Sequence, residues 1–307
     1  MKSNTKKKRF DSEARSGFLF ALPWMIGFLV FSFYPIAMSA YYSFTDFNAI
    51  KEPTWVGFEN YRRLFADPLF YKSMANTLFF VIVSVPLTII LSLVMAMLLN
   101  LKVRGRAIFR SIFFIPSILP LVASTMIWIW ILDPLDGYLN KFLQIFGIPT
   151  INWLGNPIYT HWSIILIALW GIGTTMVIFL AAIQDVPKEL YEAASIDGAN
   201  TIKKFFRITI PGIAHVMLYQ IILAVINGFQ YFSQVYIIIT AQSGNLVQGA
   251  QGGPQNSLLM YPLYLYYNAF SFLKMGRASA MAWILFMVVG LLSILLVKGS
   301  KKWVYLK

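Results

Sequence analysis

The chain has 307 residues with a net charge of +13; 58% of them are hydrophobic and only 12% are charged. A soluble domain carries about 25% charged residues, so this composition excludes an ordinary soluble fold and indicates a membrane protein. The chain has no cysteine, which excludes disulfides and cysteine-based metal or redox sites.

The N-terminal segment, residues 1–16, is basic, and an apolar stretch follows it at residues 17–43. No Asp, Glu, Lys or Arg occurs in residues 16–45. This stretch is longer than the apolar region of a cleaved signal peptide, which has about 7–15 residues. No small-residue cleavage site stands out either, so we predict an uncleaved first transmembrane helix.

Six stretches are long and apolar enough to cross a membrane. A spanning helix needs about 20 such residues, because each advances about 1.5 Å across a hydrocarbon core about 30 Å thick. The predicted spans are residues 17–43, 73–100, 109–132, 161–184, 212–240 and 278–298. Several contain proline, which membrane helices tolerate where neighbours satisfy the freed carbonyl groups. The predicted fold class is all-α, a polytopic membrane protein whose membrane domain covers residues 17–300.

The basic residues predict the orientation of these spans. With the N-terminus in the cytosol, 18 of the 25 lysines and arginines fall in cytosolic segments, whereas the acidic residues divide six and six. The positive-inside rule then places both termini in the cytosol, including residues 301–307. Topology and anionic lipid headgroups explain the basic charge, so the expected partner is a lipid bilayer, with no nucleic acid.

Three segments are then expected outside the cell. Residues 44–72 form a polar and aromatic loop, and residues 133–160 contain a short amphipathic helix at the membrane interface. Residues 241–257 are rich in glycine and glutamine and are expected to form a loop.

The spans lack the ionisable residues that an ion-coupled transporter would need. Away from their ends they contain no acidic or basic residue, although ion-coupled transporters usually place such groups in the bilayer. His161 and His215 lie near predicted span ends, where a histidine is usually just solvated. Walker A, HExxH and GxSxG patterns are absent, and no catalytic or metal-binding residue is predicted. Uphill transport would therefore need energy from another polypeptide.

One cytosolic segment, residues 185–211, breaks the apolar pattern with acids and lysines. We expect Asp185 to cap a first helix and Pro187 to lie early in it. Gly198 accepts the left-handed conformation that ends helices, and Asn200 can cap a second helix. The segment predicts a compact helix–turn–helix on the cytosolic face, suited to docking another protein.

This segment resembles the EAA loop of ABC importer permeases, whose pattern is Glu-Ala-Ala, three residues, Gly, nine residues and Ile-x-Leu-Pro. The sequence has these residues at these spacings, with Ile210 in place of the leucine. In that family the loop fits a cleft on the ATPase. The resemblance implies ATPase docking by Glu192, Ala193, Ala194, Asp197 and Gly198.

The resemblance extends to PTWVGFENYRRLF before the second span, NTLFFVIVSVP within it and MGRASAMAWILF at the start of the sixth. These runs are similar to the carbohydrate-uptake branch, and within it to relatives of the larger membrane subunit of the maltose importer. The extra N-terminal spans and large outer insertion of that subunit are missing, so maltose itself does not follow.

The resemblance implies the type I ABC importer permease fold and a permease subunit of an ATP-driven sugar or oligosaccharide importer that works by alternating access. It implies a multi-pass protein of a bacterial or archaeal cell membrane. The implied partners are a second permease subunit, a cytosolic ATPase dimer, an extracellular or periplasmic sugar-binding protein and the sugar. The chain itself would not be an enzyme and would bind no cofactor, since ATP and Mg belong to the partner ATPase.

Polar and aromatic residues inside the spans are candidates for the sugar site, because such sites pair aromatic faces with a few hydrogen-bonding groups. By resemblance, spans three to five line the substrate site. The candidates are Ser117, Ser124, Trp170, Gly171, Thr174, Asn227, Gly228, Gln230 and Tyr231. We expect Asn227, Gln230 and Tyr231 to contact the substrate, because they cluster in one otherwise apolar span. The alternative is that these polar side chains only bridge membrane helices.

Other functions stay open at this point. An ABC permease could import another solute, such as an amino acid, a peptide or a glycerol-phosphate-like compound. A secondary transporter conflicts with the uncharged spans and with the EAA-like loop. No catalytic constellation supports a membrane enzyme or an assembly scaffold.

Overall fold

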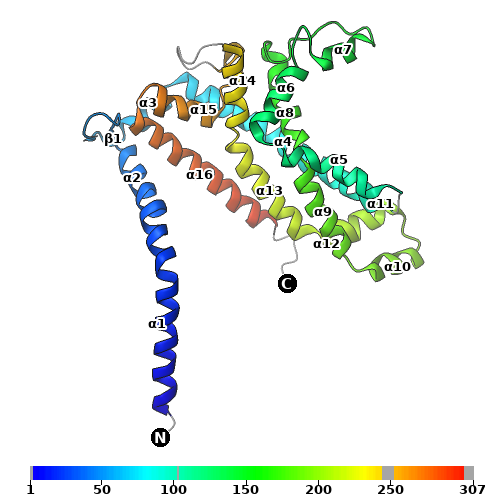
Figure 1. The fold of residues 1–307 in the computed structure, drawn as a ribbon, viewed down its shortest axis with the longest axis horizontal. Coiled ribbons are helices and arrows are strands. Elements are labelled where there is room, and N and C mark those ends of the chain that lie inside the picture. Colours follow the sequence, from blue (N-terminus) through cyan, green and yellow to red (C-terminus); the bar gives the residue numbers. More distant parts are fainter. Residues whose placement is uncertain (1–2, 102–103, 244–251, 301–307) are drawn as a thin grey trace. The chain divides into compact units, whose positions relative to one another are not determined.

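Figure 1 shows the fold in a computed structural model of the chain. The structure describes residues 3–101, 104–243 and 252–300, without the side chains of residues 3–13 and 243. The predicted C-terminal segment 301–307 lies outside the described residues, as does much of the loop predicted at 241–257.

The described part of the chain is almost entirely helical, as the all-α prediction requires. The helices are α1 (Ser3–Phe28), α2 (Tyr34–Ser43), α3 (Glu59–Phe65), α4 (Pro68–Asn100), α5 (Arg106–Ile118), α6 (Leu121–Ile131), α7 (Tyr138–Gln144), α8 (Pro157–Trp170), α9 (Gly173–Asp185), α10 (Lys188–Ile196), α11 (Thr201–Lys204), α12 (Ile210–Gly212), α13 (Ala214–Phe229), α14 (Ser233–Ser243), α15 (Tyr261–Tyr266) and α16 (Met275–Ser300). Short π-helical turns are Leu29–Phe33, Phe205–Thr209 and Tyr267–Ser271, and a 3₁₀ turn covers Pro254–Asn256. Two short strands, β1 (Thr45–Asp46) and β2 (Thr54–Trp55), pair antiparallel.

Six apolar segments of the described chain match the six predicted spans, but two of them are bent. Four continuous segments are long and apolar enough to cross a membrane: Ala14–Ser43, Pro68–Asn100, Ala214–Gln242 and Met275–Ser300. The third predicted span is the pair α5 and α6, bent by 102°, and the fourth is the pair α8 and α9, bent by 50°. The described chain therefore has four continuous candidate spans, and six if each bent pair forms one span.

Local chemistry explains both breaks. Leu119 and Pro120 are extended between α5 and α6, because proline lacks an amide hydrogen and disfavours a helical residue before it. Gly171 ends α8, and the hydroxyl of Ser92 on α4 donates to the carbonyl of Ile172 at 3.4 Å. The neighbouring helix α4 thus satisfies one of the carbonyl groups at the second break.

The chain forms two compact units. The larger one comprises residues 65–267 and 284–300 of the described chain, and in it α4 packs against both α9 and α13 (Figure 1). Two glycines allow close helix contacts. A Cβ on Gly173 would lie 2.4 Å from the carbonyl oxygen of Phe113 in α5, and a Cβ on Gly228 would lie 2.9 Å from Val81 Cγ2 in α4. Small residues let membrane helices approach in this way.

The predicted outer segment at residues 133–160 contains the expected short helix, α7. Its organising residue is Asn140, whose side chain is buried. The amide of Asn140 donates to the carbonyl of Ile151 at 2.9 Å and accepts from Trp153 Nε1 at 3.0 Å. This single side chain fixes a segment that has little other regular structure.

The smaller unit contains residues 3–64 and 268–283 of the described chain. The first outer loop is more ordered than the sequence suggested, since it holds β1, β2 and α3. Asn60 donates to the carbonyls of Ser43 at 2.9 Å and Thr45 at 2.8 Å. Gly276, at the start of α16, fits against the same turn, because a Cβ there would lie 2.1 Å from the carbonyl oxygen of Thr45.

Candidate functional site

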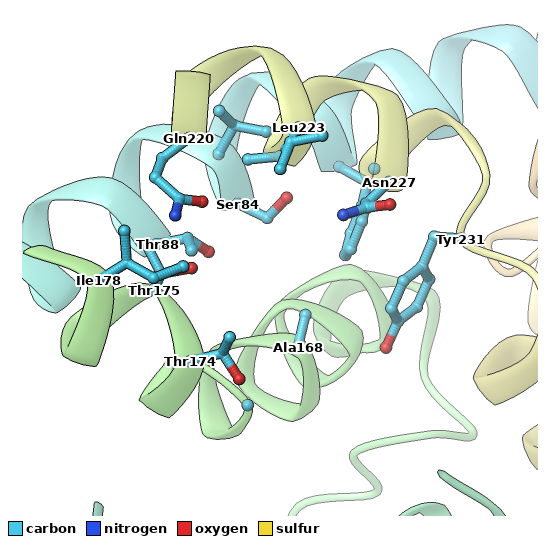
Figure 2. A pocket seen from close by; sticks show the side chains of 15 residues that line it. Ser84, Thr88, Ala168, Thr174, Thr175, Ile178, Gln220, Leu223, Asn227 and Tyr231 are labelled. Atoms are coloured by element: carbon cyan, nitrogen blue, oxygen red, sulfur yellow. The ribbon is translucent and has the colours of Figure 1, made fainter. Parts of the chain in front are cut away.

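A cavity of about 360 Å³ lies between α4, α8, α9 and α13 (Figure 2). Its volume falls within the range of ligand pockets, about 300–1,000 Å³. Its polar side chains come from α4, α9 and α13 and from the residue Tyr231 that follows α13: Ser84, Thr88, Thr174, Thr175, Gln220, Asn227 and Tyr231.

A second cavity, of about 330 Å³, adjoins the first. It reaches toward α5 and α6, and its polar and aromatic lining is Ser117, Ser124, Thr125, Trp170, Thr174, Asn227, Tyr231 and Gln234. The two cavities share Ala168, Gly171, Thr174, Asn227 and Tyr231. The break between α8 and α9 therefore forms a common wall of both.

The structure brings eight of the nine candidates predicted from the sequence to one or both cavities. Gly171, Thr174, Asn227 and Tyr231 line both, Ser117, Ser124 and Trp170 line the second alone, and Gly228 lines the first alone. Gln230 lines neither cavity and is exposed. α13 ends at Phe229, and in the non-helical segment that follows it Tyr231 turns to the cavities while Gln230 is exposed.

The sequence analysis missed several lining residues. Gln220 lies seven positions before Asn227, so the two share a helix face, and Ser84 and Thr88 are four apart on α4. Thr175 follows the candidate Thr174 directly. Gln220 could have been predicted from the sequence, because its helical spacing places it on the same face as the candidate Asn227.

The cavity is aromatic and polar but uncharged. Tyr231 packs on Phe80 with ring centroids 4.4 Å apart, and Trp170 meets Trp128 edge to face at 5.7 Å. Among the described residues, no acidic or basic side chain lines either cavity. No group of three or more His, Asp or Glu in the described chain could hold a metal ion.

Two buried polar atoms beside the first cavity are unpaired. Gln220 Nε2 and the hydroxyl of Tyr231 have no hydrogen-bond partner among the described residues, and their side chains are 5% and 9% exposed. Buried polar groups in folded proteins are nearly always hydrogen-bonded. These two atoms therefore indicate where a ligand or water would bind.

The second candidate site is the segment 185–211, which forms the predicted helix–turn–helix. Gly198 has φ +70°, and the amides of Gly198 and Ala199 donate to the carbonyls of Ser195 and Ala194 at 3.1 and 2.8 Å. These two bonds form the Schellman motif that ends a helix at a left-handed glycine. As predicted, the side chain of Asn200 caps α11 by accepting from the amide of Lys203 at 2.8 Å.

The expected cap at Asp185 is wrong. Asp185 is the last residue of α9, and Val186 leads extended into Pro187, which is itself the residue before α10 and provides no side-chain cap. Pro187 disfavours a helical residue before it, so Val186 is extended, and α10 begins at Lys188, two residues later than a cap at Asp185 would place it.

The loop is anchored on one side and exposed on the other. The hydroxyls of Tyr191 and Thr209 are hydrogen-bonded at 2.9 Å, and Tyr191 and Phe205 pack against the core of α4 and α9. On the other side, Ile196 is 88% exposed. Of the docking residues predicted from the sequence, Glu192, Ala193, Asp197 and Gly198 are exposed and Ala194 is half-buried.

Comparison with known proteins adds the following. Residues 64–304 match the model of the family described as binding-protein-dependent transport system inner membrane component. The chain is 36% identical to a probable ABC transporter permease protein, YesP, of Bacillus subtilis, covering 98% of this chain and 95% of that one. It is 34% identical to the arabinooligosaccharides transport system permease protein AraP of Bacillus subtilis, covering 95% and 90%. It is 33% identical to the trehalose/maltose transport system permease protein MalF of Thermococcus litoralis, covering 94% and 95%.

A solved structure shares the fold. One chain of a bacterial ABC transporter involved in the import of the acidic polysaccharide alginate superimposes with a TM-score of 0.77. The match covers 98% of this chain and 100% of that one at 22% sequence identity.

Proposed function

The chain belongs to the family of binding-protein-dependent transport system inner membrane components, and on that premise we propose that it is the permease subunit of an ATP-driven importer of sugars or oligosaccharides. It is a multi-pass membrane protein with the predicted type I ABC importer permease fold. In this proposal it forms half of the translocation pathway in a bacterial or archaeal cell membrane. ATP and Mg are bound by a partner ATPase, and the chain itself is not an enzyme.

The observation that carries the proposal is the pair of adjoining cavities. Hydroxyl and amide side chains stand there beside the rings of Phe80, Trp170 and Tyr231. Aromatic faces with a few convergent hydrogen-bonding groups suit ring-shaped, hydroxyl-rich ligands. The sugars named for the relatives AraP and MalF, arabinooligosaccharides and trehalose or maltose, agree with this chemistry.

The segment 185–211 supports the docking of an ATPase. It is short and preformed, and it presents exposed apolar and acidic side chains, including Ile196 and Glu192. We propose that Glu192, Ala193, Ala194, Asp197 and Gly198 form the docking surface.

The anchoring of this segment suggests how its movement reaches the cavity. Tyr191 packs against α4 and α9, and it is hydrogen-bonded to Thr209, which lies shortly before α13. All three of these helices line the first cavity. When ATP closes the ATPase dimer, the docked α10 would move with it, and the helices of the cavity would follow. The cavity then opens outward to receive sugar, and after hydrolysis it opens inward to release it.

The remaining partners of the proposal are a second permease subunit and an external sugar-binding protein. The external binding protein is supported by a solved chain of the same fold, from a bacterial alginate ABC transporter in complex with an alginate pentasaccharide-bound periplasmic protein.

A pull-down in mild detergent tests the proposal as a whole. The tagged chain is purified from its native membrane, and the co-purifying proteins are identified by mass spectrometry. We expect an ATPase with a P-loop and a second chain with six spans. Recovery of this chain alone, in a preparation that still transports solute, would overturn the proposal.

The docking surface is tested by Ile196→Lys in the same pull-down. A lysine at the end of α10 is compatible with the helix dipole, but it places a hydrated charge at the exposed apolar position beside the five docking residues. We expect at least a fivefold loss of the co-purifying ATPase. The matched control is Ile50→Lys, since Ile50 is 75% exposed in the predicted outer loop. Equal recovery of the ATPase with both variants would contradict the docking of the ATPase on α10.

A further inference from the structure

The first cavity has two polar ends, and nothing so far assigns a role to one of them. Asn227 and Tyr231 lie at one end, and Gln220 lies at the other together with Thr88 and Thr175 (Figure 2). Gln220 and Asn227 are seven residues apart on α13, which is about 10 Å along a helix axis. By the predicted topology, the Gln220 end is the one nearer the cytosol.

A role in bridging two helices does not account for Gln220. A bridging glutamine would be hydrogen-bonded to a neighbouring helix, yet its Nε2 has no partner among the described residues although the side chain is only 5% exposed. Figure 2 shows its amide directed into the cavity, toward the side of Thr88 and Thr175. An unpaired buried donor needs an explanation, and an acceptor that arrives with a ligand would supply one once the side chain turns to meet it.

We propose that Gln220, Thr88 and Thr175 form a second, inner subsite that binds an uncharged sugar unit, while Asn227 and Tyr231 bind its neighbour. This inference rests on the proposed function and deepens it. The amide of Gln220 donates to a hydroxyl or ring oxygen, and the two threonine hydroxyls accept or donate in return. A single six-membered ring, with bonds of about 1.5 Å, is too short to reach both ends, so a substrate that fills both subsites has at least two units.

The residues that line the two cavities disfavour a charged ligand. A carboxylate accepts hydrogen bonds but donates none, and burying it is unfavourable without a countercharge. None of the side chains lining either cavity in the described residues is basic. The inner subsite therefore fits a neutral glycosyl unit and disfavours a uronate.

Transport by the whole complex tests the proposal. The chain is reconstituted with its co-purified partners in proteoliposomes, and ATP-dependent uptake of maltose, maltotriose, arabinobiose, arabinotriose and trigalacturonate is measured. We expect uptake of a neutral di- or trisaccharide and at least tenfold slower uptake of trigalacturonate. Comparable uptake of trigalacturonate overturns the assignment to a neutral unit.

The central variant is Gln220→Met, which keeps the length of the side chain and removes its hydrogen-bonding groups. We expect kcat/KM for the best neutral probe to fall about tenfold. Thr175→Val, which keeps the shape of threonine, should act in the same direction. Gln144→Met, at an exposed position of α7 outside both cavities, is the matched control.

Two readouts separate ligand binding from a structural role. Removal of an unpaired buried amide should leave the melting temperature of the purified chain unchanged or raised in Gln220→Met, whereas a structural glutamine would lower it. Among monodeoxy analogues of the best neutral probe, one should be transported equally by wild type and Gln220→Met, because it lacks the hydroxyl that Gln220 contacts.

These experiments distinguish a failure of the proposed function from a failure of the inner subsite. If the wild-type complex takes up none of the five saccharides and its ATP hydrolysis responds to none, the proposed function falls, and this inference with it. If a neutral saccharide is taken up but Gln220→Met and Thr175→Val both match the wild type, the inner subsite is wrong while the importer stands.

Discussion

The phenol hydroxyl of Tyr191 lies 2.9 Å from the hydroxyl of Thr209, and this hydrogen bond ties the exposed helix α10 to the segment that leads into α13. Thr209 is buried at this contact. The bond therefore joins the proposed docking surface to a helix of the cavity.

A double-mutant cycle on this pair measures the connection. Tyr191→Phe, Thr209→Val and the double variant each remove the same bond, so the two single effects should not add. We expect a coupling free energy of about 1 kcal/mol, the usual net value of one intramolecular hydrogen bond. The measurements are thermal unfolding in detergent and the sugar-stimulated rate of ATP hydrolysis in the complex. Strictly additive effects on both would contradict a role for this bond in coupling.

Gly198 gives a prediction that depends on backbone conformation alone. Its φ is +70° and no atom lies within 4 Å of a Cβ placed there, so Gly198→Ala adds no clash. It forces an L-residue into the left-handed region, which costs about 1–2 kcal/mol. We expect weaker sugar-stimulated ATP hydrolysis because the turn that ends α10 loosens.

The control for this variant is Gly290→Ala, because Gly290 has equal free space but lies within α16 at an ordinary φ. Alanine is favoured over glycine there by about 1 kcal/mol. Gly290→Ala should therefore leave stability unchanged or raised. An equal loss of activity in both variants would mean that left-handed geometry is not the cause.

Two neighbouring glycines should respond oppositely to alanine. Gly171 faces the shared wall of the cavities, and its added Cβ would have only one neighbour within 4 Å, at 3.7 Å. Gly173→Ala would press a Cβ to 2.4 Å from the carbonyl of Phe113, and overpacking of this kind costs about 1–3 kcal/mol. We expect normal thermal stability for Gly171→Ala and a clear loss for Gly173→Ala.

A larger side chain at Gly171 extends this test to transport. Gly171→Phe should block uptake while the chain still assembles with its ATPase, because the ring fills the wall between the cavities. Uptake at the wild-type rate would show that the pathway runs elsewhere.

The structure separates two residues that the sequence grouped together. Asn227 lines both cavities and Gln230 lines neither. Asn227→Ala should reduce uptake about tenfold, corresponding to about 1.4 kcal/mol, whereas Gln230→Ala should keep uptake within twofold of wild type. Initial rates of sugar uptake at matched expression decide between them, and the reverse order would favour the grouping by sequence.

Residue spacing was enough to predict most of the fold. The apolar runs located all six candidate spans, and the spacing from Glu192 to Pro211 located the helix–turn–helix. The turn was predictable because Gly198 and Asn200 act on their immediate neighbours. The cap expected at Asp185 failed because Pro187 keeps Val186 extended, so Asp185 ends α9 instead of starting α10.

The site was only partly predictable because it depends on tertiary packing. Asn227 and Tyr231 stand out in a single apolar span, but a cavity is defined by facing helices, and Ser84 and Thr88 come from the second span, in which no site residue was predicted. The bend of 102° after Ile118 could not be calculated from Pro116 and Pro120, because proline also occurs within continuous helices here, as at Pro86 in α4.

The break between α8 and α9 has a consequence for mutational scanning. Helix ends leave backbone carbonyls without intrahelical donors, and Gly171, directly after the end of α8, lines both cavities. Main-chain oxygens are present in every variant, whatever the side chain. If each polar side chain of the cavities is replaced by alanine in turn, part of the affinity for the ligand should therefore remain in every variant. This remaining affinity is the contribution of the backbone carbonyls.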